Sequence, residues 1–233
     1  MKKILGRVGV SRGWWLAGVF ALGYALSGSS AQAAWVGVQN LDCLKGTDLL
    51  GREEVYLLAT YSRNFPPGIG ADSGTQRFPA PQGHYSLHCG NTAGVQLLPL
   101  MAELPPVGGH TFLALTVAED DNEGAGAGIH ASAELARSLR YLQFSQVMDP
   151  YRPFIEQLDR GYVAALLGDP WRKLGSDDYL GTVLVEFFTD PWGRPRVAWS
   201  GGSASVDLTN GQLPHFQLTG SGSLYRLILT FGL

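Results

Sequence analysis

Acidic residues gather in four short segments at the ends of predicted strands, where they could bind a hard cation. Two of these segments precede the strands 55–61 and 182–188, and two follow the strands 112–117 and 182–188. Their acidic residues are Asp48, Glu53, Glu54, Glu119, Asp120, Asp121, Glu123, Asp177, Asp178 and Asp190. If the first three segments in the chain share one end of a sandwich, five or more carboxylates converge and repel one another unless a cation separates them. Ca²⁺, which takes about six to eight oxygen ligands, is the expected ion.

Other interpretations of the same residues remain open. Asp, Asn and Gly are also the residues that turns prefer, so the acidic segments could be solvated turns. A zinc site would draw on His84 and His88, but these stand in a segment predicted to be extended, where a spacing of four separates the side chains.

Catalytic interpretations are weaker. The chain has no Gly-x-Ser-x-Gly motif, and Ser73 resembles a protease nucleophile only loosely. Glu119 with Glu54 or Asp178 could form the carboxylate pair of a glycosidase. Three tryptophans could stack on sugars, although packing in a core is their commoner role; they are Trp171, Trp192 and Trp199.

The elements that must position these residues are mostly strands. Apolar and β-branched residues recur between Gly, Pro and Asn in nine segments: 35–43, 55–61, 94–100, 112–117, 182–188, 196–200, 203–208, 216–218 and 224–231. Short strands at close spacing predict a mostly β protein, an antiparallel β-sandwich.

One insertion interrupts the strands, at about 124–171. Leu135, Leu139 and Leu142 follow helical spacing within 129–148, and a second helical periodicity covers 154–167. We therefore expect a two-helix insertion in one end loop. The stretch 66–81, rich in Gly, Pro and Ser, predicts a long loop.

The first 33 residues have the three parts of a secretory signal peptide. Four basic residues precede an apolar stretch, 14–26, which is followed by Ala31-Gln32-Ala33. The apolar stretch is shorter than the roughly 20 residues of a membrane span, so cleavage after Ala33 is expected, with an uncleaved anchor as the alternative. A single domain, 34–233, would then be secreted or periplasmic, with no transmembrane segment.

Cleavage makes the protein more acidic. It removes four basic residues and no acidic one, so the formal net charge changes from −3 to −7. Non-specific binding to nucleic acid requires a surplus of Lys and Arg, so a nucleic-acid partner is not expected.

Two cysteines, Cys43 and Cys89, follow the predicted cleavage site. An even number of cysteines in an oxidising compartment predicts a disulfide bond. A free or metal-binding pair is the alternative, although the spacing has no CxxC motif.

The acidic segments resemble the calcium-binding loops of C2 domains, which are eight-stranded antiparallel sandwiches. Asp48, Gly51, Glu54 and Tyr56 match the spacing of one family loop. A later loop is matched by Val117, Glu119 and Asp121 and, on its return, by 178–181. The resemblance implies that the Ca²⁺ ligands are Asp48, Glu54, Glu119, Asp121 and Asp178.

Together these patterns predict an exported, non-enzymatic, C2-like binding protein. We expect Ca²⁺ at one end of the sandwich and recognition of a protein, lipid or glycan by the adjacent insertion. The alternatives are a metal-free structural or interaction protein of the envelope and a small hydrolase that uses the clustered carboxylates.

Overall fold

The computed structural model describes most of the chain after the predicted signal peptide. The described residues are 33–46, 52–64, 71–79, 83–90, 99–103, 109–120, 126–145, 167–168, 170–171, 178–200, 206–207, 215–220 and 222–232. The signal peptide lies outside them except for Ala33, so it remains a prediction from sequence.

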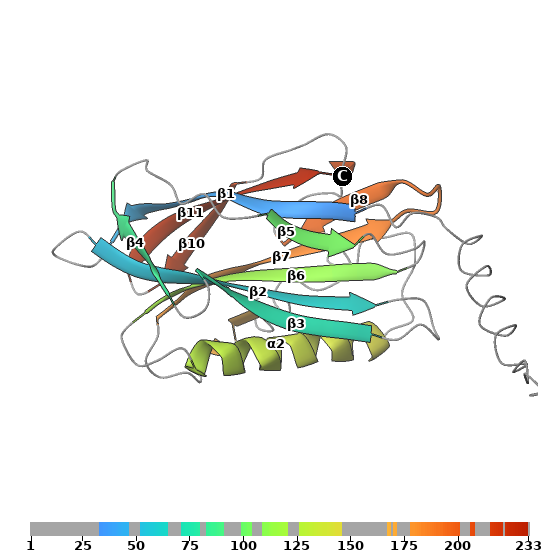
Figure 1. Ribbon diagram of the computed structural model, residues 1–233, viewed down its shortest axis with the longest axis horizontal. Helices are drawn as coiled ribbons and strands as arrows, with labels where there is room; N and C mark the ends of the chain where they lie inside the picture. The colour runs from blue at the N-terminus through green and yellow to red at the C-terminus, as the bar shows by residue number, and fades with distance from the viewer. Residues whose placement is uncertain are drawn as a thin grey trace, which may run out of the picture. The chain divides into compact units, whose positions relative to one another are not determined.

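The strands of the described chain form two antiparallel sheets (Figure 1). The smaller sheet has the order β10 (His215–Gly220), β11 (Ser223–Gly232), β1 (Ala33–Lys45) and β5 (Pro99–Glu103). The larger sheet has the order β3 (Ala71–Phe78), β2 (Arg52–Asn64), β6 (His110–Glu119), β7 (Tyr179–Thr189), β8 (Pro195–Trp199) and β9 (Val206–Asp207), and β4 (Tyr85–His88) also pairs with β2. The predicted class, mostly β and antiparallel, is confirmed.

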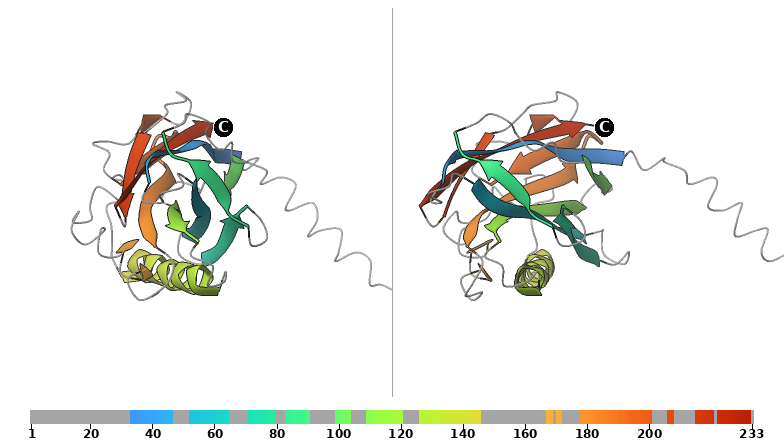
Figure 2. Two further views of the ribbon diagram at one scale, coloured as in Figure 1. Left: turned by 90° about the vertical axis from the view of Figure 1, so that its left-hand side faces the viewer. Right: turned by 60° about the vertical axis from the view of Figure 1, so that its left-hand side comes forward.

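The main hydrophobic core lies between the two sheets. Alternate residues of β11 are buried, as the period of two of a strand requires when one face is covered. Phe231 of this strand packs its ring against Phe187 of β7 and Trp199 of β8, with centroids 6.2 and 6.1 Å apart. These contacts join the smaller sheet to the larger one, and the end-on view in Figure 2 shows the sheets facing each other. The arrangement agrees with the predicted sandwich.

A single long helix, α2 (Gly126–Ser145), covers the outer side of β2 and β3 within the described part of the chain (Figure 2). Ala131 of α2 belongs to a second apolar cluster with Tyr56, Leu58, Ala118 and Trp171. The helix predicted at 129–148 is therefore confirmed. The second predicted helix, 154–167, lies outside the described residues except for Leu167. No described helix is long and apolar enough to cross a membrane.

One sequence prediction is wrong. The composition of 66–81 predicts a loop, but Ala71–Phe78 forms β3 and pairs with β2 along its whole length. Its Ser, Thr and Gln side chains give little apolar signal because β3 is an edge strand, held by the backbone ladder rather than by a buried face. At its C-terminal end Arg77 and Phe78 are buried, at 7% exposure each.

The predicted disulfide bond between Cys43 and Cys89 is confirmed. Cys43 lies in β1 of the smaller sheet, and Cys89 directly follows β4 of the larger sheet. The Gly90 amide also donates to the Cys43 carbonyl oxygen at 3.0 Å. The bond therefore ties the two sheets together near the end at which β2 begins.

Candidate functional site

Three of the acidic segments meet at one end of the larger sheet. The Asp120 amide donates to the Glu54 carbonyl oxygen at 2.7 Å, and the Glu119 amide donates to the Asp178 carbonyl oxygen at 2.9 Å. This arrangement follows from the pairing of β6 with both β2 and β7, which sets the start of β2, the end of β6 and the start of β7 side by side. We call this the acidic end. Asp48 and Asp121 lie outside the described residues.

The strands place the predicted ligands on two different faces. Glu119 is the cross-strand partner of Val55, a fully buried residue of the main core. Cross-strand partners share a face of a sheet, and neighbours along a strand alternate. Glu119 therefore lies on the inner side of the larger sheet, whereas Glu54 lies on the outer side with Asp120. The spacing in the sequence did not predict this separation.

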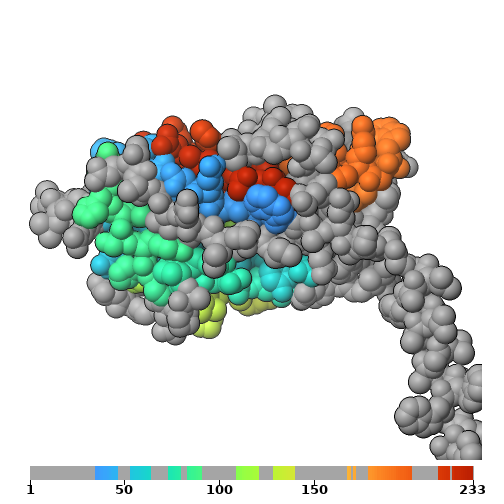
Figure 3. Space-filling model, turned by 45° about the horizontal axis from the view of Figure 1, so that its top comes forward, coloured from blue at the N-terminus to red at the C-terminus, as the bar shows by residue number. Residues whose placement is uncertain are grey.

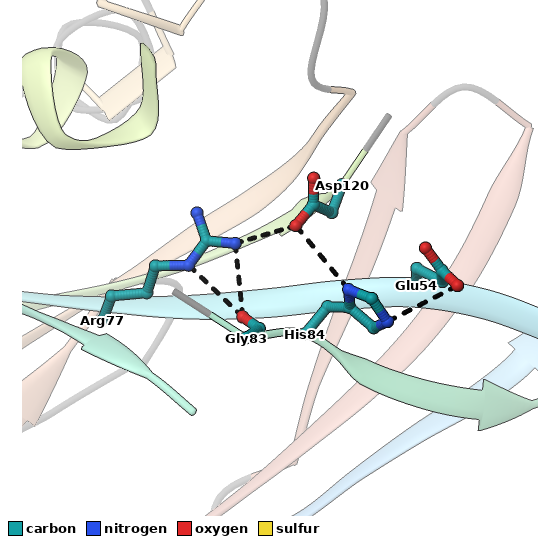
Figure 4. Close-up of polar contacts among 5 residues, drawn as sticks. All are labelled: Glu54, Arg77, Gly83, His84 and Asp120. Atoms are coloured by element: carbon teal, nitrogen blue, oxygen red, sulfur yellow. Dashed lines mark hydrogen bonds and ion pairs between the residues drawn. The ribbon is translucent and has the colours of Figure 1, made fainter. Parts of the chain in front are cut away.

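On the outer side, basic residues contact the carboxylates (Figure 4). Nη2 of Arg77 lies 2.9 Å from Oδ2 of Asp120. Nδ1 of His84 lies 3.8 Å from the same carboxylate, and Nε2 of His84 lies 3.4 Å from the carboxylate of Glu54. The Arg77 side chain is only 5% exposed, donates to the Gly83 carbonyl oxygen and lies over the Tyr56 ring at 3.7 Å. Much of the negative charge at the acidic end is thus balanced by side chains of the protein itself.

Sequence reasoning missed this role of Arg77. The residue stands in the segment that was expected to be a loop, and 43 positions separate it from Asp120. Its position in β3, the strand beside β2, is the feature that brings it to the acidic end.

On the inner side, Tyr225 is fully buried near Glu53 and Glu119. Burial raises the pKa of the Tyr225 hydroxyl above its ordinary value, the negative charges of Glu53 and Glu119 raise it further, and Ser223 opposes the shift. Glu53 is 1% exposed and packs so closely against Gly46 that a Cβ there would lie 2.0 Å from Glu53 Oε1. Position 46 therefore favours glycine, and the inner side carries the buried carboxylate of Glu53 together with the partly exposed Glu119.

Replacing Tyr225 with Phe should leave the stability unchanged at neutral pH or raise it by about 1 kcal/mol. The hydroxyl has no hydrogen-bond partner of ordinary geometry among the described residues, and a buried polar group without one is costly. The pKa of Tyr225 is higher in the folded state than in the unfolded state, where it is about 10. Its contribution to the free energy of unfolding is therefore complete below pH 10 and is lost as the pH rises further. Urea denaturation from pH 7 to 11 measures this effect. Above pH 10 the free energy of unfolding should fall less in the variant than in the wild type. A loss of more than about 1 kcal/mol at pH 7 would contradict it.

A Ca²⁺ site at the acidic end requires several side-chain oxygen atoms close together. Among the described residues, no three His, Cys, Asp or Glu side chains are grouped so that they could hold a metal ion. Glu54, 42% exposed, lies on the outer side, whereas Asp178 meets Glu119 across β6 through a backbone hydrogen bond. A full coordination sphere needs oxygens from the segments of Asp48 and Asp121 as well. The five-residue site therefore remains a prediction.

Comparisons with protein-family models, curated proteins and solved structures found no match to this chain. The described chain is an antiparallel β protein in which a helix covers one sheet and acidic residues gather at one end of that sheet.

Proposed function

We propose that the protein is an exported, non-enzymatic binding protein whose acidic end binds Ca²⁺ and contacts a partner. Export is supported by the signal-peptide pattern and by the disulfide, which is typical of oxidising compartments. Loops at the end of a rigid scaffold are common positions for recognition. The resemblance to C2 domains agrees with both parts of the proposal.

The observation that carries the proposal is the meeting of the chain segments that contain Glu54, Glu119 and Asp178. Two backbone hydrogen bonds join segments that are far apart in the sequence, so the chain following β6 begins beside the start of β2. Asp121 directly follows Asp120, and Asp48 stands six positions before Glu54. Glu54 would supply an oxygen on the outer side, and Asp48, Asp121 and Asp178 the oxygens that complete the site. Glu119 would act on the inner side, as a second negative charge near the ion.

Saturating Ca²⁺ should raise the melting temperature of the chelator-treated mature protein. A ligand that binds only the folded state stabilises it by about 2.7 kcal/mol at one hundred times its Kd. The double variant Asp121→Asn and Asp178→Asn should abolish the shift, because it removes two carboxylates without changing side-chain size. Differential scanning calorimetry with and without Ca²⁺ measures both effects.

The control is Glu134→Gln, which removes one negative charge from α2 rather than two from the acidic end. This variant should keep the full Ca²⁺ shift. Equal shifts in the double variant and the wild type would show that Ca²⁺ binds elsewhere, and no shift in the wild type would reject the calcium proposal.

A second candidate is a metal-free interaction protein. It is favoured by one observation, the contacts of Arg77 and His84 with Asp120 and Glu54, which balance charge at the acidic end without an ion. In that case the melting temperature is the same with Ca²⁺ and with chelator, and the affinity for the partner is the same under both conditions.

A further inference from the structure

The turn between β7 and β8 is held rigidly by one carboxylate. Oδ1 of Asp190 accepts hydrogen bonds from the amides of Trp192 and Arg194 at 3.0 and 2.9 Å, and Oδ2 accepts one from Nε of Arg194 at 2.8 Å. Burial raises the pKa of Asp190, but these hydrogen bonds and the charge of Arg194 outweigh it and lower the pKa. Gly193 takes a positive φ of 78°, which favours glycine. The turn is therefore a preformed structure.

This turn presents an aromatic ring to solvent. Trp192 is 76% exposed, and the guanidinium carbon of Arg194 lies 5.0 Å from the centre of its ring. Because Asp190 fixes the guanidinium group, the ring is supported while most of its surface remains open. The β7–β8 segment lies at one end of the molecular surface, in orange in Figure 3. An anchored aromatic side chain loses little entropy on binding, so the turn is organised for recognition.

The surroundings of Trp192 indicate the kind of partner. The other exposed large apolar side chains in the described residues are Leu44 in β1 and Ile129 in α2, and neither is part of the turn. Protein hot spots are enclosed by further contacts, and interfacial membrane anchors bury a broad apolar face. A sugar ring needs only one aromatic face for its C–H groups and hydrogen-bond donors at the edge for its oxygens. Arg194, whose guanidinium lies over the Trp192 ring, can supply donors to a sugar at that ring, since its Nη1 and Nη2 atoms bind no other described residue.

We infer that Trp192 and Arg194 form a carbohydrate-binding site that takes a pyranose sugar, with a carboxylate-bearing sugar preferred to a neutral one. The preference follows from Arg194, because guanidinium and carboxylate groups form strong, charge-assisted hydrogen bonds. Asp190 is a positioning residue, which acts through Arg194 and the turn. The inference names the class of partner and rests on the proposed function only in taking the protein to be a binding protein.

The site lies at the end of β7 opposite the acidic end. Asp178 directly precedes β7 and Asp190 directly follows it, so the full length of the strand separates them. Glycan binding at Trp192 should therefore persist in chelator, and a failure of the calcium proposal leaves this inference intact.

A glycan array that carries neutral, uronate-containing and sialylated glycans tests the site, with the mature protein applied in chelator. We expect binding to glycans that carry carboxylates. Trp192→Ala should weaken binding at least about tenfold, the change that 1.4 kcal/mol produces. Trp192→Phe should restore part of the affinity, and Arg194→Gln should remove the preference for acidic over neutral glycans.

The matched control is Ile129→Ala, which removes another exposed apolar side chain and should bind as the wild type does. No binding of the wild type to any glycan, or equal binding of Trp192→Ala, overturns the inference. Binding to vesicles of phosphatidylcholine and phosphatidylglycerol that is lost in Trp192→Ala also overturns it, because the turn would then be a membrane contact.

Discussion

Replacing Cys43 and Cys89 together with Ala should lower the free energy of unfolding by about 4 kcal/mol. The two cysteines are 46 positions apart, and the chain-entropy relation for a closed loop of that size gives about this value. The bond also ties β1 of the smaller sheet to the turn after β4 of the larger one, so its loss should loosen the packing of the sheets. Urea denaturation of the mature protein measures the change.

The double replacement avoids a free thiol, and the wild type in a reducing agent is its control. Both samples should unfold at the same lower urea concentration, because each lacks the same bond. A loss below about 1 kcal/mol would mean that the disulfide contributes little to the fold.

Arg77→Met should destabilise the protein by about 2 to 4 kcal/mol. The change preserves much of the packing over Tyr56 but removes the charge that Asp120 faces at 2.9 Å. Breaking a buried ion pair by removing one partner costs about 3 to 5 kcal/mol, and the 16% exposure of Asp120 lowers that figure. Denaturation at pH 7 gives the value.

Arg63→Met is the matched control, since Arg63 also lies over a tyrosine ring, that of Tyr61 at 5.1 Å. It should cost less than about 1 kcal/mol, as expected of a partly exposed cation–π contact. A double-mutant cycle with Asp120→Asn isolates the energy of the pair. If Arg77→Met costs no more than the control, the ion pair at the acidic end is not a source of stability.

The sequence predicted the parts of the fold that depend on local pattern. The run 112–117 is apolar almost throughout, as a strand covered on both faces must be, and β6 is buried between the core and the outer layer. In 224–231 the buried positions alternate because only one face of β11 meets the core. The disulfide followed from an even cysteine count. The convergence of the acidic segments depended on strand order, which the structure supplied.

The features that the sequence did not predict depend on register and on pairing between distant residues. The inward position of Glu119 follows from its alignment with Val55, and a shift of one residue would have turned it outward. Fully buried Glu186 is paired with His110 at 2.5 Å, and 76 positions separate the two. No local pattern encodes such a contact. The acidic composition therefore indicated a charged site but not which carboxylates already have partners.

The central claim is that Ca²⁺ binds at the acidic end, and amide chemical shifts test it most directly. In ¹H–¹⁵N spectra of the chelator-treated mature protein, saturating Ca²⁺ should shift the amides of Glu54, Asp120 and Tyr179 while leaving those of the β7–β8 turn, such as Gly193, in place. Spectra that do not change on addition of Ca²⁺, or changes confined to residues away from the acidic end, would contradict the claim.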